Sequence, residues 1–303
     1  MRAAAFHEFG GPHVLKEVDL PAPHAGPGQV RVRVRAAGVQ PIDCAIRSGR
    51  RNSHLVSAFP HITGGEFAGQ IDQVGPNVTG LRPGDQVLGY RTQGTYAQYT
   101  VVPYDQVVIK PASMPWEIAA GLPGAGQAAH TAIEALGVRA GDTFLINGAA
   151  GGVGTVAVQL ARHRKATVIG TASKANHDYL RSLGAIPLTY GDGLADRIRA
   201  LVPAGPDVAL DAAGAAGLRV AVELVTSPDR VGTITARETY KESGARWIGS
   251  QRSAERLDDL VRLYTAGVLR LHVRALYPLR KAAHAHRDVE SGHGRGKVVL
   301  SLS

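Results

Sequence analysis

Cysteine is nearly absent from this sequence of 303 residues, which contains only Cys44. A single cysteine excludes an internal disulfide framework and a structural zinc site with four cysteine ligands. Long apolar runs are missing too, since no stretch approaches the roughly 18 to 20 residues that span a membrane. The N-terminal segment reaches Glu8 before any apolar core of a signal peptide. We therefore expect a protein of the reducing cytoplasm with no membrane partner.

Aromatic residues are also scarce, at 5%, although the formal net charge is +9. Such a charge can mark nucleic-acid binding, but the basic residues are spread along the chain. Arg31, Arg33 and Arg35 alternate with valines, as on the solvent face of a half-buried strand. Aromatic-rich basic segments, which stack on bases, are lacking. We expect no nucleic-acid partner, and keep a nonenzymatic RNA-binding or structural protein as the alternative to an enzyme.

A glycine-rich stretch, NGAAGGVGTVAVQLAR at 147–162, follows the apolar β-type run Thr143 to Ile146. After Gly154 the apolar positions fit a packed helix. Strand, glycine turn and helix are typical of a dinucleotide-binding unit, in which backbone N–H groups approach a pyrophosphate. The spacing is Ala149-x-Gly151-x-x-Gly154, so alanine replaces the first glycine of the usual motif. Taken alone, the motif also fits a glycine turn in another α/β protein.

The end of the next strand indicates which cofactor binds. The segment ATVIGTASK ends in Thr171, Ser173 and Lys174, with no acid before Asp178. An acid at this place would bind the ribose 2′-hydroxyl of NADH, whereas a hydroxyl and an ammonium bind a 2′-phosphate. The sequence therefore predicts NADPH, and the alternative is that Lys174 is an ordinary surface lysine.

The chain divides into two blocks with different patterns, as its length also suggests at about 150 residues per domain. Residues 1 to about 112 are rich in alternating strands and turn signals, which predicts an antiparallel, barrel-like β domain. A helix is expected from about Pro115 to Leu136, before the glycine turn. The later alternation predicts a parallel sheet with helices on both faces. Its elements are expected at Thr167–Gly170, Asp178–Leu183, Ala185–Leu188, Leu194–Leu201, Asp207–Asp211, Leu218–Leu224 and Arg230–Thr235.

Several motifs occur in a fixed order over almost the whole chain, among them AAGVQPIDCAIRSG, ITGGEFAGQIDQVG, LRPGDQVLGY, GTYAQYTVVP, DVALDAAG and ESGHGRGKVVLSL. Together with the glycine turn they resemble the zinc-free, zeta-crystallin-like quinone oxidoreductases of the medium-chain dehydrogenase/reductase superfamily. The resemblance implies a Rossmann-type doubly wound parallel sheet domain at 119–268, which binds NADPH. It also implies a GroES-like β-barrel catalytic domain formed by 1–118 and 269–303.

The resemblance also implies the residues that bind the cofactor. They are Ala150, Gly151, Gly152, Val153 and Gly154 at the pyrophosphate, Ser173 and Lys174 at the 2′-phosphate, and Tyr190 as a second contact on the adenosine side.

The zinc-bearing alcohol dehydrogenases of the same superfamily are the obvious rival. Their metal needs a cysteine near the start of the catalytic domain, a Gly-His-Glu segment and a later cysteine. Here Cys44 is displaced, Gly65 stands where the histidine would be, and Glu66 alone falls short of the three protein ligands of a catalytic zinc. His284 and His286 lie two apart in a helical segment and so point to different faces. We expect no metal.

Without a metal, hydride donation to an electron-poor acceptor is favoured over alcohol oxidation. A quinone and the β-carbon of an α,β-unsaturated carbonyl compound both qualify. The resemblance places Gln40 at the nicotinamide end of the cleft, as the candidate catalytic residue whose amide donates to the acceptor oxygen or the cofactor carboxamide. A buried structural glutamine is the alternative. A tyrosine and a threonine common in the family are replaced by Cys44 or Ala45 and by Ala128, so solvent is the expected proton source. Cys44 itself is expected to be a small buried packing residue.

Two expectations concern partners. Arg47, Arg50 and Arg51 lie within five residues, and arginine forks suit carboxylate or phosphate oxygens. This loop would favour an anionic acceptor or a thioester on a phosphopantetheine arm, and a solvated surface loop is the alternative. The resemblance suggests a homodimer formed through the nucleotide domain, with the strand at Arg230–Thr235 as its edge. No pattern identifies the substrate.

Overall fold

The structure is a computed structural model that describes residues 1–302. The chain forms two compact units. Unit 1 comprises Met1–Gly124, Ser253–Arg262 and the described part of Leu271–Ser303, and unit 2 comprises Ala125–Arg252 and Leu263–Arg270. Two helices contribute residues to both units, α2 (Trp116–Ala135) and α8 (Ala254–Thr265). No helix among residues 1–302 is long and apolar enough to cross a membrane.

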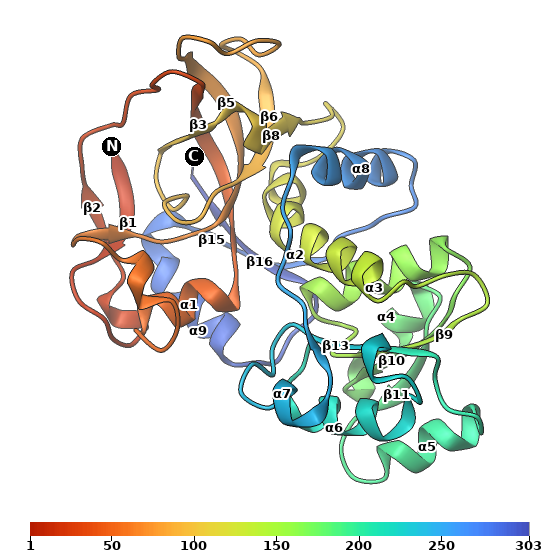
Figure 1. The fold of residues 1–303 in the computed structure, drawn as a ribbon. Coiled ribbons are helices and arrows are strands. Elements are labelled where there is room, and N and C mark those ends of the chain that lie inside the picture. The colour runs from red at the N-terminus through yellow and green to blue at the C-terminus, as the bar shows by residue number, and fades with distance from the viewer. Residues whose placement is uncertain (303) are drawn as a thin grey trace. The chain divides into compact units, whose positions relative to one another are not determined.

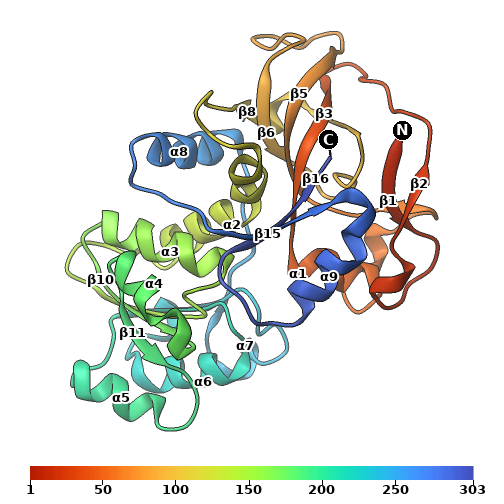
Figure 2. The ribbon, with the colours of Figure 1, turned by 180° about the vertical axis from the view of Figure 1, so that it is seen from behind.

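Unit 1 is built on two sheets, which are mainly antiparallel. The larger has the order β15-β16-β3-β5-β6-β8, with β7 also paired to β3, and the smaller has the order β2-β1-β4. The last strand of the chain lies beside β3, as Figures 1 and 2 show. The strands are β1 (Arg2–Phe6), β2 (Lys16–Asp19), β3 (Gln29–Val39), β4 (His61–Ile62), β5 (Glu66–Val74), β6 (Gln86–Tyr90), β7 (Tyr99–Pro103), β8 (Val107–Ile109), β15 (Val273–Pro278) and β16 (Lys297–Ser301).

Strand β3 shows how the sequence pattern produces this unit. Val30, Val32 and Val34 are buried, whereas Arg33 and Arg35 are exposed, so the predicted alternation is confirmed. The strand continues past the alternating segment that ends at Arg35, because the following residues are small and apolar and both of their faces are covered.

Two helices of unit 1 lie against each other, α1 (Pro41–Arg47) and α9 (Ala282–Glu290). Figures 1 and 2 both show them side by side. His284 on α9 is exposed and His286 is buried, which confirms that the two histidines face different sides. The short 3-10 helices of this unit are η1 (Pro12–Val14), η2 (Ser53–Leu55), η3 (Tyr104–Gln106) and η6 (Leu279–Lys281).

Unit 2 has one six-stranded sheet, in the order β11-β10-β9-β12-β13-β14, and all its neighbouring strands are parallel. The chain enters at β9 in the middle, winds to β11 and then returns to form the other half, which is the Rossmann order. The strands are β9 (Thr143–Asn147), β10 (Thr167–Ala172), β11 (Ile186–Thr189), β12 (Val208–Asp211), β13 (Val231–Thr233) and β14 (Arg246–Trp247). The helices are α3 (Gly152–His163), α4 (His177–Ser182), α5 (Leu194–Leu201), α6 (Ala215–Leu224) and α7 (Tyr240–Ser243), with η4 (Lys174–Asn176) and η5 (Pro228–Arg230).

The predicted edge strand at Arg230–Thr235 is wrong. Strand β13 pairs with β12 on one side and with β14 on the other, so it lies inside the sheet. The two-residue strand β14 forms that edge instead. A strand of two residues carries no readable alternation, which is why the pattern did not reveal it.

Candidate cofactor and active site

The glycine turn of unit 2 joins the end of β9 to the start of α3, as predicted. Gly148 has φ +77°, a conformation that favours glycine. A Cβ at Gly154 would lie 2.3 Å from the carbonyl oxygen of Gly148, so the helix packs on the turn only with glycine there. A Cβ at Gly151 would meet only that same oxygen, at 3.3 Å. The side of the turn at Gly151 is therefore open to a ligand.

The N-terminus of α3 has the features of an anion site. Gly151 is the N-cap residue, and no side chain caps the helix. The N–H groups of Gly152, Val153 and Gly154 have no carbonyl four residues earlier in the helix. These donors and the helix dipole together favour a phosphate group. Ala150, just before the N-cap residue, is buried.

Polar side chains lie at or next to the C-terminal ends of four neighbouring strands, at one level of the sheet. In strand order they are Thr171 on β10, Asn147 on β9, Asp211 on β12 and Thr233 on β13, and the registers place each beside the next. Thr171 Oγ1 donates to Asn147 Oδ1 at 3.1 Å, and Thr233 Oγ1 donates to Asp211 Oδ2 at 2.6 Å. The N–H of Gly148 donates to Thr171 Oγ1 at 3.3 Å. This row fixes the loops at the switch point of the sheet, where ligands of such folds bind.

Sequence reasoning missed the row. In the sequence, each of these polar residues is visible only as a polar position near the end of an apolar strand. That the four lie side by side follows from the strand order, which the sequence pattern does not give. The strand order places Asp211 next to Asn147, although they are 64 positions apart in the sequence.

The adenosine-side candidates lie at the same edge of the sheet. Ala172 on β10 pairs with Thr189 on β11, so Ser173 and Tyr190 leave neighbouring strands at the same level. Lys174 is exposed, and within residues 1–302 no carboxylate lies within 4 Å of its ammonium. The tyrosine is 54% exposed. The structure thus brings the three predicted residues together.

In unit 1, Gln40 is the N-cap residue of α1 and is half-buried. Its backbone N–H donates to Asp43 Oδ2 at 2.9 Å. Its amide nitrogen lies over two glycines: a Cβ at Gly124 would be 2.3 Å from Nε2, and one at Gly65 would be 3.9 Å away. The carboxamide therefore occupies the place that a side chain at Gly124 would need, whereas a Cβ at Gly65 would be in ordinary van der Waals contact with it.

Next to this amide lies a buried ion pair. Glu66 is fully buried, and its Oε1 lies 2.6 Å from Nζ of Lys297. Its Oε2 accepts the N–H of Gly124 at 2.6 Å. The ammonium also donates to the carbonyl of Val39 at 3.2 Å. Both carboxylate oxygens are therefore engaged by the protein.

A second buried group lies behind Gln40. Burial raises the pKa of Asp43 to about 7, although its Oδ2 accepts the hydroxyl of Tyr96 at 2.8 Å. The Cys44 thiol is buried and donates to the carbonyl of His286 at 3.8 Å, and burial raises its pKa. Desolvation lowers the pKa of His286 to about 3, so its ring is neutral. The prediction that Cys44 is a buried packing residue is confirmed.

The donor set does not fit a catalytic zinc. Among residues 1–302 there is no group of three or more His, Cys, Asp or Glu side chains arranged to hold a metal ion. Cys44 faces a main-chain carbonyl, and Glu66 is held by Lys297 and Gly124.

The predicted role of Arg47 in an arginine-rich entrance is wrong. Arg47 is fully buried and pairs with Glu290 on α9. Arg50 lies 3.5 Å from the same carboxylate and is 68% exposed at its side chain. The helical position of Arg47 turns its side chain into the interface between α1 and α9, where it cannot meet a ligand in solution.

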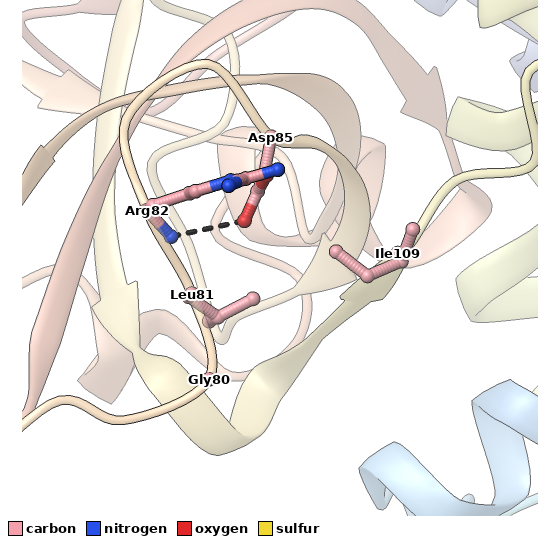
Figure 3. Close-up of a pocket in the computed structure, with 5 residues that line it drawn as sticks. All are labelled: Gly80, Leu81, Arg82, Asp85 and Ile109. Carbon is pink, nitrogen blue, oxygen red and sulfur yellow. Dashed lines mark hydrogen bonds and ion pairs between the residues drawn. The ribbon is translucent and has the colours of Figure 1, made fainter.

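The surface of unit 1 also has a hollow lined by Gly80, Leu81, Arg82, Asp85 and Ile109 (Figure 3). The backbone N–H of Arg82 donates to Asp85 Oδ2 at 2.9 Å, and the guanidinium lies 3.4 Å from Oδ1. The guanidinium of Arg82 and the carboxylate of Asp85 in this hollow therefore pair with each other.

Comparison with known proteins adds to this geometry. Residues 26–112 match the alcohol dehydrogenase GroES-like domain family, and residues 188–300 match the zinc-binding dehydrogenase family. A quinone oxidoreductase of Mus musculus is 32% identical, over 100% of this chain and 98% of that protein. The solved quinone oxidoreductase of Coxiella burnetii is 32% identical with a TM-score of 0.91, over 100% and 99% of the two chains. A mycobacterial protein solved in complex with NADPH is 28% identical with a TM-score of 0.89, over 100% of both chains.

Proposed function

The chain belongs to the quinone oxidoreductase family of the medium-chain dehydrogenase/reductase superfamily, and we propose that it reduces a quinone or the carbon–carbon double bond of an α,β-unsaturated carbonyl compound without zinc. Membership makes it an NADPH-dependent oxidoreductase with a GroES-like and a Rossmann-like domain.

The uncapped start of α3 supports the proposed binding site for the pyrophosphate of the cofactor. In the proposal, the N–H groups of Gly152, Val153 and Gly154 bind the pyrophosphate, with Ala150 and Gly151 forming the turn before them. When bound, NADPH supplies the hydride. Ser173 and Lys174 bind the 2′-phosphate by hydrogen bonds, and Tyr190 covers the adenosine side. In the proposal, residues 119–268 bind the cofactor, and residues 1–118 and 269–303 form the catalytic domain.

Gln40 is the residue proposed to act on the acceptor. Hydride transfer to a quinone or an enone places negative charge on the acceptor oxygen, and a fixed amide donor stabilises that charge. The backbone hydrogen bond to Asp43 and the close packing of the carboxamide on Gly124 support a fixed position. Proton delivery to the product is left to solvent, since the buried thiol of Cys44 faces a carbonyl.

The zinc-independent chemistry is supported by the donor set. The carboxylate of Glu66 is neutralised by Lys297, and the neighbouring Gly65 offers no side chain.

We further propose a homodimer formed through unit 2 and a cytoplasmic location. A mass from light scattering that corresponds to one chain would overturn the dimer.

The test is an acceptor panel of quinones, 2-alkenals and enoyl thioesters, followed by the loss of NADPH absorbance. We expect turnover of at least one class, unchanged after dialysis against a chelator. Gln40→Met keeps the side-chain volume but removes the donor, and kcat should fall by about 10²-fold. Turnover that is lost with chelator and restored by Zn²⁺ would contradict the zinc-free mechanism. No turnover of any class would contradict the proposed acceptors.

A further inference from the structure

Arg197 on α5 binds the main chain of the loop that follows β11. Its Nη1 donates to the carbonyl of Asp192 at 2.8 Å, and its Nη2 donates to those of Thr189 at 2.9 Å and Gly191 at 3.4 Å. These three carbonyls lie on both sides of Tyr190 in the sequence. One guanidinium thus closes the loop from Thr189 to Asp192.

The charge of Arg197 has no acidic partner. Within the described residues no carboxylate lies within 4 Å of it, and the neighbouring Asp196 pairs with Arg199 instead. Its Nε is buried and has no hydrogen-bond partner there. Half-buried arginines usually meet a carboxylate, because desolvation of an unpaired charge is costly. The positive potential near this loop is therefore available to an anionic ligand.

The loop lies at the sheet edge that carries Ser173 and Lys174. Thr189 pairs with Ala172, the residue just before them. The hydroxyl of Thr189 also lies 3.3 Å from Nε2 of His177, the first residue of α4. The loop is thus held from α4 and from α5. The hydroxyl of Tyr190 has no hydrogen-bond partner within residues 1–302, so no hydrogen bond of its own side chain fixes this ring.

We propose that Arg197 is a positioning residue that holds the hydroxyl of Tyr190 at the 2′-phosphate, on the adenosine side of the cofactor, and so contributes to the preference for NADPH over NADH. The inference rests on the proposed function, in which the 2′-phosphate lies beside Ser173 and Lys174. An arginine is required because its planar fork reaches three carbonyls at once, which a lysine ammonium at the end of a flexible chain does not.

The test compares the binding of NADPH and NADH, measured by the fluorescence of the reduced nicotinamide. Arg197→Met should weaken NADPH binding by about 10-fold, the loss of roughly one charge-assisted hydrogen bond from the Tyr190 hydroxyl to the 2′-phosphate, and NADH binding by less than about 2-fold. Arg197→Lys keeps the charge but not the fork, and it should weaken NADPH binding to a similar extent. Arg199→Met is the matched control on the same helix, since Arg199 pairs with Asp196 and Glu223. The control should bind both cofactors as the parent protein does.

A double-mutant cycle with Tyr190→Ala separates positioning from simple charge attraction. If Arg197 acts through Tyr190, Arg197→Met should add little to the loss caused by Tyr190→Ala. Fully additive losses, or equal losses for NADPH and NADH, would overturn the inference.

Lys174→Ala tests the proposed function separately. A selective loss of NADPH binding in Lys174→Ala, with both Arg197 variants unchanged, overturns the Arg197 role alone. Equal effects on both cofactors in Lys174→Ala overturn the proposed 2′-phosphate site, and this inference with it.

Discussion

Lys297 and Glu66 form a buried ion pair across strand β3, with Nζ and Oε1 2.6 Å apart, although 231 positions separate them in the chain. Strands β16 and β5 flank β3 on opposite sides. Their side chains meet at Gly38, where a Cβ would lie only 2.2 Å from Oε1 of Glu66. A residue without a side chain is therefore needed at the point where the C-terminal strand closes the sheet.

Lys297→Met should destabilise the protein by about 3 to 5 kcal/mol, because it leaves the Glu66 carboxylate buried without its cation. The double variant with Glu66→Gln should recover a large part of that loss, since the buried charge is then gone. Urea unfolding followed by circular dichroism measures both. A loss below about 1 kcal/mol in Lys297→Met would show that solvent reaches the carboxylate.

Two glycines of the turn should respond differently to substitution. Gly151→Val places a branched side chain on the open side of the turn, where the pyrophosphate is proposed to bind, so NADPH binding should be lost while stability changes little. Gly154→Ala forces a Cβ against the carbonyl of Gly148 and should cost about 1 to 3 kcal/mol of stability. Cofactor titration and thermal unfolding of both variants test this contrast. Normal NADPH binding by Gly151→Val would refute the phosphate assignment.

Local patterns explain why much of unit 2 could be predicted. The helix at Leu194–Leu201 was predicted with the bounds that the structure has, and the strand at Thr143 differs only by ending at Asn147. In both, the hydrophobic period and the adjoining turn residues lie within a few positions of each other. The glycine turn before α3 is local in the same way. Strand, turn and helix of the candidate site therefore follow from adjacent residues.

Features that depend on distant residues could not be predicted. The sequence predicts a solvent-exposed side chain at Arg47. In the structure this side chain is buried, and it pairs with Glu290, which lies 243 positions later. Asp43 and Tyr96 meet 53 positions apart, and Arg197 binds carbonyls that carry no sequence signal. Cross-strand and helix–helix contacts of this kind are set by the assembled fold, so no local pattern encodes them.

Lys174→Ala should weaken NADPH binding by about 10- to 150-fold and leave NADH binding nearly unchanged, because it removes one charge-assisted hydrogen bond to the 2′-phosphate, worth about 1.5 to 3 kcal/mol. The exposed ammonium has no carboxylate within 4 Å in the described chain, so the substitution breaks no ion pair of the protein. Lys16→Ala, at an exposed position of β2, serves as the control for a general change in charge. Isothermal titration with each cofactor decides the matter, and an equal loss for both would contradict the role of Lys174.

Asp43 should make stability fall as the pH rises from about 4 to about 7. Burial raises the pKa of its carboxyl in the folded state to about 7, whereas the usual value is about 4. Between these values the folded state holds a proton that the unfolded state has lost, so the free energy of unfolding decreases with pH by up to about 1.4 kcal/mol per unit.

Asp43→Asn removes this titration and retains a carbonyl oxygen to accept the N–H of Gln40 and the hydroxyl of Tyr96. The slope contributed by this group should therefore disappear in the variant. Urea unfolding of both proteins at pH 5, 6 and 7 gives the comparison, with the stability at pH 5 as the internal reference. Parallel pH profiles would show that Asp43 is already ionised at pH 5 in the folded protein, and that Lys297 or solvent stabilises its charge more than burial opposes it.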